Sequence, residues 1–173
     1  MTYNLYHTNV YNQLLHSNIN LYDKNILDIG SRDGINCISM IKLGAKNIIG
    51  IDLDDTQFSK IDEYEEKNKI TLIKSNILNL NYQNKFDIVT CFLWNFNLPD
   101  YHKIFNKIKS LVNPDGLILI GIHDDLYKYG YKNLTNTGSV IELINSHFNN
   151  YSILDNKDPF QWIIKIKMDS ILN

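Results

Sequence analysis

The strongest indication of the fold comes from the stretch of residues Leu27-Asp28-Ile29-Gly30-Ser31-Arg32-Asp33-Gly34. Its first residues continue an apolar run from Ile26, which predicts a buried strand that ends at Gly30. Gly30 and Gly34 lie at the two ends of a turn, where glycine lets the backbone bend sharply and approach a ligand. A helix is predicted directly after Gly34, so its first N–H groups point into the turn. The stretch therefore predicts a strand, a ligand-binding turn and a helix, in that order.

Outward from this turn, strands and helices are predicted to alternate along the chain. The predicted strands cover 26–29, 47–52, 70–74, 86–92, 117–122, 151–154 and 161–167. The predicted helices cover 35–43, 56–67, 100–112 and 140–148, the last with Ser139 as its N-cap. This alternation predicts a parallel α/β sheet with helices on both faces. Ligands bind at the carboxyl ends of the strands in such sheets.

Size and composition set limits on the class of protein. A chain of 173 residues predicts a single domain over 1–173, with a core that needs no disulfide or metal. The 17 basic and 19 acidic residues give a net charge of -2. This balance disfavours a surface built for nucleic acid, although Lys128 and Lys132 leave a local basic patch open. The frequent Asn, Ile, Lys and Tyr follow the codons of an AT-rich genome.

The cysteines and the first residues bear on the compartment. Cys37 and Cys91 lie in apolar stretches, which predicts two reduced, buried thiols. No secretory signal is expected, because residues 1–21 lack a basic start followed by an apolar run. No apolar run reaches the length of a membrane span. Together these features predict a cytoplasmic protein.

The turn also carries an acid two residues before its first glycine. A dinucleotide-binding turn has the pattern GxGxxG, but Arg32 and Ile35 occupy its second and third glycine positions. The pattern of Asp28, Gly30 and Gly34 instead resembles (D/E)xGxGxG, the first motif of class I S-adenosylmethionine-dependent methyltransferases. This family implies a seven-stranded, mostly parallel, doubly wound sheet of order 3-2-1-4-5-7-6 with an antiparallel last strand.

The resemblance implies roles for the residues of the turn. Asp28 would help to hold the methionyl ammonium of S-adenosylmethionine, and the backbone of Gly30, Ser31, Arg32 and Gly34 would wrap its amino-acid part. Arg32 is the only arginine of the chain and stands where the family has glycine. We expect its planar guanidinium near the cofactor carboxylate or at the pocket mouth. An exposed loop residue is the alternative.

Three further features follow the next strands. An acid at the end of the second strand, Asp52, would accept from both ribose hydroxyls, and Leu53 would pack on the adenine face. A dinucleotide site also has such an acid, so Asp52 alone does not separate the cofactors. After the third strand, Asn76 offers a carbonyl oxygen and Ile77 a backbone contact to the base. The Phe86-Asp87-Ile88-Val89 strand resembles a family strand whose end, at Phe92, passes beside the methionyl group.

Candidates for chemistry follow the fourth and fifth strands. His123 could act as the general base, or could be a histidine that only hydrogen-bonds at a strand end. Trp94 and Asn95, with Tyr11 from the opening segment, are the candidate substrate pocket; core packing is the alternative for Trp94. Asp124 and Asp125 lack a partner acid after the fourth strand, so no metal site is expected.

The preferred hypothesis is a small S-adenosylmethionine-dependent methyltransferase. Residues 1–24 would form an N-terminal lid or covering helix, 25–123 the cofactor-binding core, and 124–173 a C-terminal helix and strand pair. Short loops favour a small molecule or a sugar or nucleotide group as acceptor. The first alternative is a catalytically degenerate methyltransferase fold that serves as a cofactor-binding or interaction module. A nicotinamide-dependent dehydrogenase is disfavoured by Asp28 and by the missing GxGxxG pattern.

Overall fold

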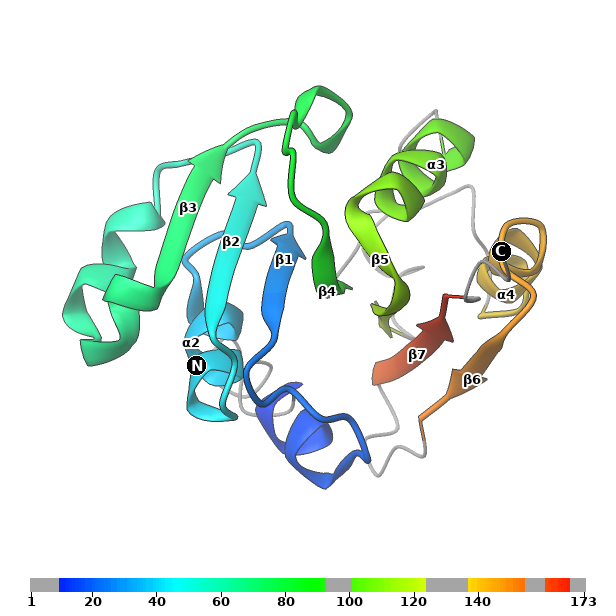
Figure 1. Ribbon diagram of the computed structural model, residues 1–173, viewed down its shortest axis with the longest axis horizontal. Helices are drawn as coiled ribbons and strands as arrows, with labels where there is room; N and C mark the ends of the chain where they lie inside the picture. The colour runs from blue at the N-terminus through cyan, green and yellow to red at the C-terminus, as the bar shows by residue number, and fades with distance from the viewer. Residues whose placement is uncertain (1–9, 93–100, 124–136, 155–160, 169–173) are drawn as a thin grey trace.

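The computed structural model describes residues 10–92, 101–123, 137–154 and 161–168. Its strands form one seven-stranded sheet in the order β3-β2-β1-β4-β5-β7-β6 (Figure 1). The strands are β1 (Asn25–Ile29), β2 (Asn47–Asp52), β3 (Ile70–Lys74), β4 (Phe86–Cys91), β5 (Val112–His123), β6 (Tyr151–Ile153) and β7 (Gln161–Lys167). The first five strands are parallel, and β7 runs antiparallel to both β5 and β6. The predicted strand order and the antiparallel last strand are confirmed.

Helices cover both faces of this sheet. The α-helices are α2 (Ile35–Lys42), α3 (Tyr101–Leu111) and α4 (Thr137–Asn145), and residues 10–16 are also helical. One core lies between the sheet and α3 and α4, where Phe105 and Ile108 meet Ile144 and Phe148. The other core lies between the sheet and α2 with the helix of residues 10–16. Because both faces are covered, the central strands are apolar on both sides, as buried parallel strands are.

The segment predicted as a helix over 56–67 forms two short 3-10 helices, η1 (Phe58–Glu63) and η2 (Glu65–Lys69). Tyr64 between them has extended backbone angles, which interrupt the helix. Phe58, Ile61 and Tyr64 recur every three residues, which is the period of a 3-10 helix rather than that of an α-helix. The spacing was therefore interpreted with the wrong period, and the prediction of one helix is corrected.

Other boundaries also differ from the prediction. The third helix ends at Leu111, one residue before its predicted end, and the next residue, Val112, already pairs with Phe86 of β4. Residues 113–116 bulge out of β5 before pairing resumes between Leu117 and Ile88. The last helix begins at Thr137, so Ser139 lies inside it and is not its N-cap.

Candidate functional site

The turn after β1 lies at the carboxyl edge of the sheet and is tied to β2. The backbone N–H groups of Gly30 and Ser31 both donate to the carbonyl oxygen of Ile51, at 2.8 and 3.1 Å. Gly30, Arg32 and Gly34 all have left-handed backbone angles, with φ of 78°, 46° and 75°. Glycine adopts this region without strain, whereas Arg32 does so at a cost of about 1–2 kcal/mol. The predicted sharp turn is confirmed.

The two glycines of the turn meet different surroundings. A Cβ on Gly34 would lie 2.4 Å from the Cγ2 of Ile61 and 3.3 Å from the Cδ1 of Leu72, so Gly34 is required for close packing against η1 and β3. A Cβ on Gly30 would meet nothing within 4 Å. The turn is therefore packed tightly at its helical end and open at its strand end, which is where a ligand could approach the backbone.

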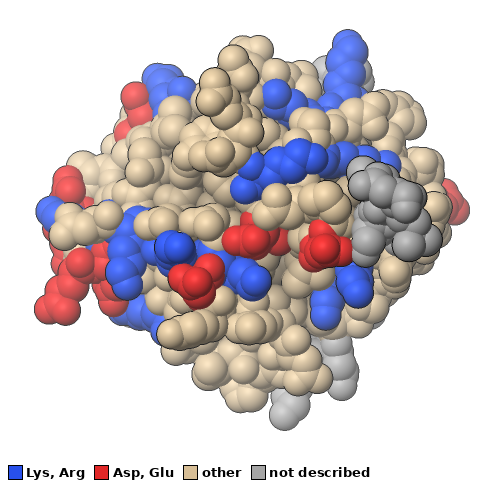
Figure 2. All heavy atoms as spheres, in the orientation of Figure 1, with Lys and Arg blue, Asp and Glu red and all other residues tan. Residues whose placement is uncertain are grey.

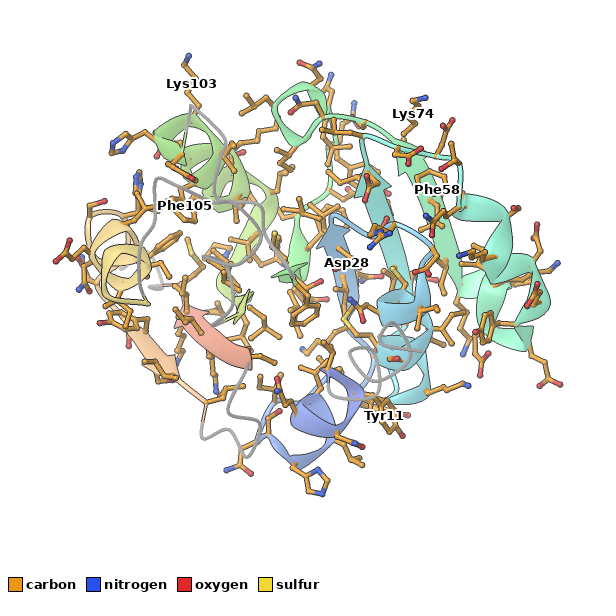
Figure 3. All side chains as sticks on the ribbon, turned by 180° about the vertical axis from the view of Figure 1, so that it is seen from behind. Tyr11, Asp28, Phe58, Lys74, Lys103 and Phe105 are labelled. Carbon is orange, nitrogen blue, oxygen red and sulfur yellow. The ribbon has the colours of Figure 1, made fainter. Side chains whose placement is uncertain are left out.

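Asp28 lies below the turn with its carboxylate enclosed, 1% exposed (Figure 3). Its Oδ1 accepts from the hydroxyl of Thr90 at 2.7 Å, and its Oδ2 accepts from the thiol of Cys37 at 3.3 Å. Burial raises the pKa of Asp28 to about 6, although both hydrogen bonds act in the opposite direction. The negative charge of Asp52 raises it further. Asp28 therefore changes its charge close to neutral pH.

A second buried acid, Asp33, was not singled out from the sequence. It is 1% exposed and lies in the turn just before α2. Its Oδ1 accepts weakly from the Ile35 N–H at 3.4 Å, and its Oδ2 is buried without a hydrogen-bond partner among the described residues. The hydroxyl of Ser31, also buried, lacks a partner in the same sense. The signal that could have pointed to Asp33 is the presence of an acid inside a glycine turn.

Asp52 ends β2 and faces the same turn. Its Oδ2 accepts from the backbone N–H of Arg32 at 2.9 Å, and its Oδ1 accepts from the N–H of Asp54 at 3.0 Å. Two backbone donors thus hold the carboxylate in one orientation. A carboxylate has about four acceptor positions, so each oxygen keeps capacity for a further donor such as a hydroxyl.

Arg32 is exposed on the β2 side of the turn. The pKa of Asp54 is lowered chiefly by hydrogen bonds from the N–H and hydroxyl of Thr56, and also by the charges of Lys74 and Arg32. The guanidinium therefore lies close enough to influence Asp54, at the mouth of the turn beside the end of β2. A place for Arg32 at the mouth of a cofactor pocket stays a prediction, and an exposed loop residue stays the alternative.

Around the ends of β2 and β3 lie the residues predicted to meet the base. Leu53 is 63% exposed, which is unusual for a leucine and leaves an apolar surface beside Asp52. Asn76 is exposed, but its carbonyl oxygen accepts from the Leu78 N–H at 2.9 Å and so caps the short helix η3 (Ile77–Asn79). The Ile77 side chain is buried in the core on the α3 side, which leaves only its backbone for a ligand.

The other predicted site residues belong to β4, β5 and the helix of residues 10–16, or lie outside the described residues. The Phe92 side chain is buried in the core on the α2 side. Figure 3 places Tyr11 on the helix of residues 10–16, well apart from Asp28. His123 is the last residue of β5, where its backbone is opposite Gln161 of β7. The predicted pocket residues Trp94 and Asn95, and the lysines at 128 and 132, lie outside the described residues.

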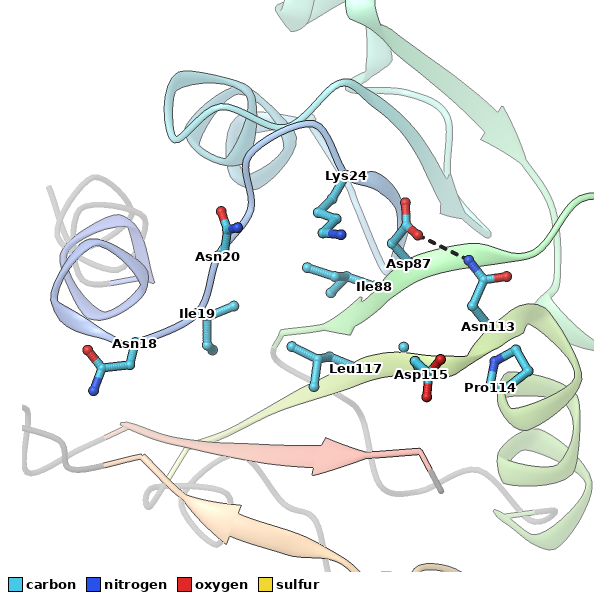
Figure 4. A pocket seen from close by; sticks show the side chains of 11 residues that line it. Asn18, Ile19, Asn20, Lys24, Asp87, Ile88, Asn113, Pro114, Asp115 and Leu117 are labelled. Carbon is cyan, nitrogen blue, oxygen red and sulfur yellow. Dashed lines mark hydrogen bonds between the residues drawn. The ribbon is translucent and has the colours of Figure 1, made fainter. Parts of the chain in front are cut away.

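A separate hollow of about 590 Å³ lies at the opposite edge of the sheet (Figure 4). Asn18, Lys24, Asp87 and Leu117 are among its lining residues. Asp87 makes hydrogen bonds within the protein: its oxygens accept from the N–H of Asn25 at 2.9 Å and from the amide of Asn113 at 3.1 Å. These bonds connect the starts of β1 and β4 to the bulge of β5.

Comparison with known proteins identifies the family. A model described as a methyltransferase domain matches residues 4–161. The chain belongs to this family. Together with the strand order, this confirms the resemblance to class I S-adenosylmethionine-dependent methyltransferases.

Two relatives and one solved structure illustrate the likeness. Ubiquinone biosynthesis O-methyltransferase of Actinobacillus pleuropneumoniae is 30% identical over 106 residues, which are 57% of this chain and 45% of that protein. tRNA U34 carboxymethyltransferase of Campylobacter fetus is 32% identical over 109 residues, 59% of this chain and 37% of that protein. The chain thus spans less than half the length of either relative.

The solved structure is that of N-methyltransferase NodS from Bradyrhizobium japonicum in complex with S-adenosyl-L-homocysteine. It has a TM-score of 0.70 and 15% identity, and the match covers 94% of this chain and 85% of that one. At this identity the likeness shows the fold alone. Within the described part of the methyltransferase domain, no three His, Cys, Asp or Glu side chains are placed to share a metal ion, and none of its helices has the length and apolarity of a membrane span.

Proposed function

We propose that this methyltransferase domain binds S-adenosylmethionine at the turn after β1 and transfers its methyl group to an acceptor. The observation that carries the proposal is the set of three acids at this turn: Asp28 and Asp33 are buried beside it, and two backbone N–H groups orient the carboxylate of Asp52. S-adenosylmethionine has an ammonium, a carboxylate and two ribose hydroxyls, and it needs acceptors and donors in this arrangement.

The residues at this edge of the sheet fit the parts of such a cofactor. Asp52 has free acceptor positions for the ribose hydroxyls, and the exposed Leu53 beside it offers an apolar surface to the adenine. The open space at Gly30 admits the amino-acid part against the backbone. The first N–H groups of α2 are donors for the carboxylate of the cofactor.

The reaction asks little of the protein beyond alignment, because the sulfonium of the bound cofactor supplies an activated methyl group. For a hydroxyl acceptor a base must remove a proton, and His123 at the carboxyl end of β5 is our candidate. No metal enters this scheme. Trp94 and Asn95 stay candidates for the acceptor pocket, as the sequence predicts.

The acceptor is proposed to be a small molecule or a sugar or nucleotide group. The relatives named above are a ubiquinone biosynthesis O-methyltransferase and a tRNA U34 carboxymethyltransferase, and their names support both kinds of acceptor as candidates. Basic and acidic side chains are mixed on the face shown in Figure 2, and the net charge is -2. This charge pattern does not favour a broad nucleic-acid surface. Cys37 and Cys91 are free, buried thiols, which fits the proposed cytoplasmic location.

The test is isothermal titration with S-adenosylmethionine, S-adenosylhomocysteine and NAD. Binding of the first two and not of NAD is expected. Binding followed by methyl transfer to at least one member of an acceptor panel would distinguish an enzyme from a binding module. Failure of both S-adenosyl compounds to bind would overturn the proposal.

A further inference from the structure

Two buried acids lie at the turn after β1, Asp28 in the strand and Asp33 in the turn itself, and they differ in their hydrogen bonds. Asp28 has a hydrogen bond at each oxygen, from Thr90 and from Cys37. Asp33 has one weak bond at Oδ1 and none at Oδ2, within the part of the chain that the structure describes. Both are almost completely buried. An unpaired oxygen of a buried carboxylate is costly, so its retention calls for a donor that the ligand-free protein lacks.

The two acids belong to one cluster at the start of α2. Cys37 interacts with both of them. Its thiol donates a hydrogen bond to Asp28. Burial is the main cause that raises the pKa of this thiol, and the charges of Asp28 and Asp33 raise it further. No lysine or arginine is recorded in an ion pair with either acid among the described residues. A ligand with a positive group would supply the missing charge and the missing donor together.

We propose that Asp33 is the direct acceptor for the cofactor's ammonium group, and that Asp28 acts behind it as a positioning residue held by Thr90 and Cys37. This inference rests on the proposed function. An ammonium has three N–H donors and a full charge, so one of them meets the unpaired Oδ2 of Asp33. Asp33 therefore sets the affinity for ligands that carry the amino-acid part.

The experiment compares three ligands by isothermal titration at pH 7.5. S-adenosylmethionine and S-adenosylhomocysteine both carry the ammonium, whereas 5′-methylthioadenosine carries the nucleoside and sulfur without it. Asp33→Asn is expected to weaken the first two about 10- to 100-fold and the third less than about 2-fold. Asp62→Asn removes an equal charge from the exposed Asp62–Lys67 pair and is expected to leave all three unchanged.

Thermal unfolding of the same variants separates binding from structure. Asp33→Asn removes an unpaired buried charge, so its melting temperature is expected to equal or exceed that of the wild type. Asp33→Ser keeps an acceptor for the Ile35 N–H and serves if the first variant does not fold.

Three results would overturn the inference. They are unchanged affinity for S-adenosylhomocysteine in Asp33→Asn, equal weakening of 5′-methylthioadenosine, or weakening of S-adenosylmethionine alone, which would point to the sulfonium instead. If the wild type bound none of the three ligands, the proposed function would fail and this inference with it.

Discussion

The hydroxyl of Thr90 donates a 2.7 Å hydrogen bond to the carboxylate of Asp28, across the neighbouring strands β4 and β1. The two residues are direct partners in the register of the sheet, so their side chains project from the same face. The thiol of Cys37 in α2 donates to the other oxygen of the same carboxylate. The acid of the glycine turn is thus enclosed by a strand and a helix that come later in the chain.

This enclosure predicts a specific pH dependence of stability. The pKa of Asp28 is about 6 in the folded protein and near 3.8 when exposed, so the folded state holds the proton more tightly. The contribution of Asp28 to stability is present below about pH 4 and is lost as the pH rises through 6. Asn cannot ionise, so at pH 7 and above the free energy of unfolding of Asp28→Asn should exceed that of the wild type by up to about 3 kcal/mol.

Urea denaturation of both proteins from pH 4 to pH 8 measures the effect. The difference in unfolding free energy, variant minus wild type, should grow between pH 4 and pH 6 and stay constant above pH 7. A difference that does not change with pH would contradict the enclosure of an ionisable Asp28.

Asp52 is expected to dominate the affinity for the nucleoside part of the cofactor. Asp52→Ala removes the acceptor that two backbone N–H groups orient, and should weaken S-adenosylhomocysteine and 5′-methylthioadenosine alike by at least about 10-fold. The matched control is Asp55→Asn, since Asp55 is exposed and paired with Lys74 at the same edge of the sheet. Isothermal titration of both variants with the two ligands measures these affinities. Intact affinity in Asp52→Ala would remove Asp52 from the site.

The two glycines of the turn offer a matched pair of substitutions. Both have positive φ, so alanine at either position costs about 1–2 kcal/mol of backbone strain. At Gly34 the new Cβ also collides with Ile61, which should add about 1–3 kcal/mol. The free energy of unfolding should therefore be higher for Gly30→Ala than for Gly34→Ala. Gly30→Ala should weaken cofactor binding, because the new methyl group occupies the open space at Gly30. Equal stabilities would contradict the packing of η1 on the turn.

His123 is expected to act on the acceptor and not on the cofactor. With a hydroxyl acceptor found in the panel, His123→Gln should lower turnover about 100-fold or more and leave S-adenosylhomocysteine affinity within about 2-fold of the wild type. Unchanged turnover would assign His123 a structural role at the end of β5.

Much of the fold could be predicted from the sequence. The apolar runs of β1, β2 and β5 and the apolar stripe of α3 are local patterns, and each formed close to its predicted position. The 3-10 helices were missed because a spacing of three residues over a short segment fits both helix types. The third helix was predicted one residue too long, since a sequence pattern does not show that Val112 pairs with Phe86 before the bulge.

Some features of the candidate site could likewise be predicted from the sequence, and others could not. The glycine turn, Asp28 and Asp52 could be identified without a structure, because glycines and acids at the ends of strands are local features with a direct physical meaning. The enclosure of Asp28 by Thr90 and Cys37, and the unpaired oxygen of Asp33, became apparent only from the packed structure. Burial and hydrogen bonding depend on side chains from distant segments, and the sheet brings these together only when β4 and α2 pack against β1.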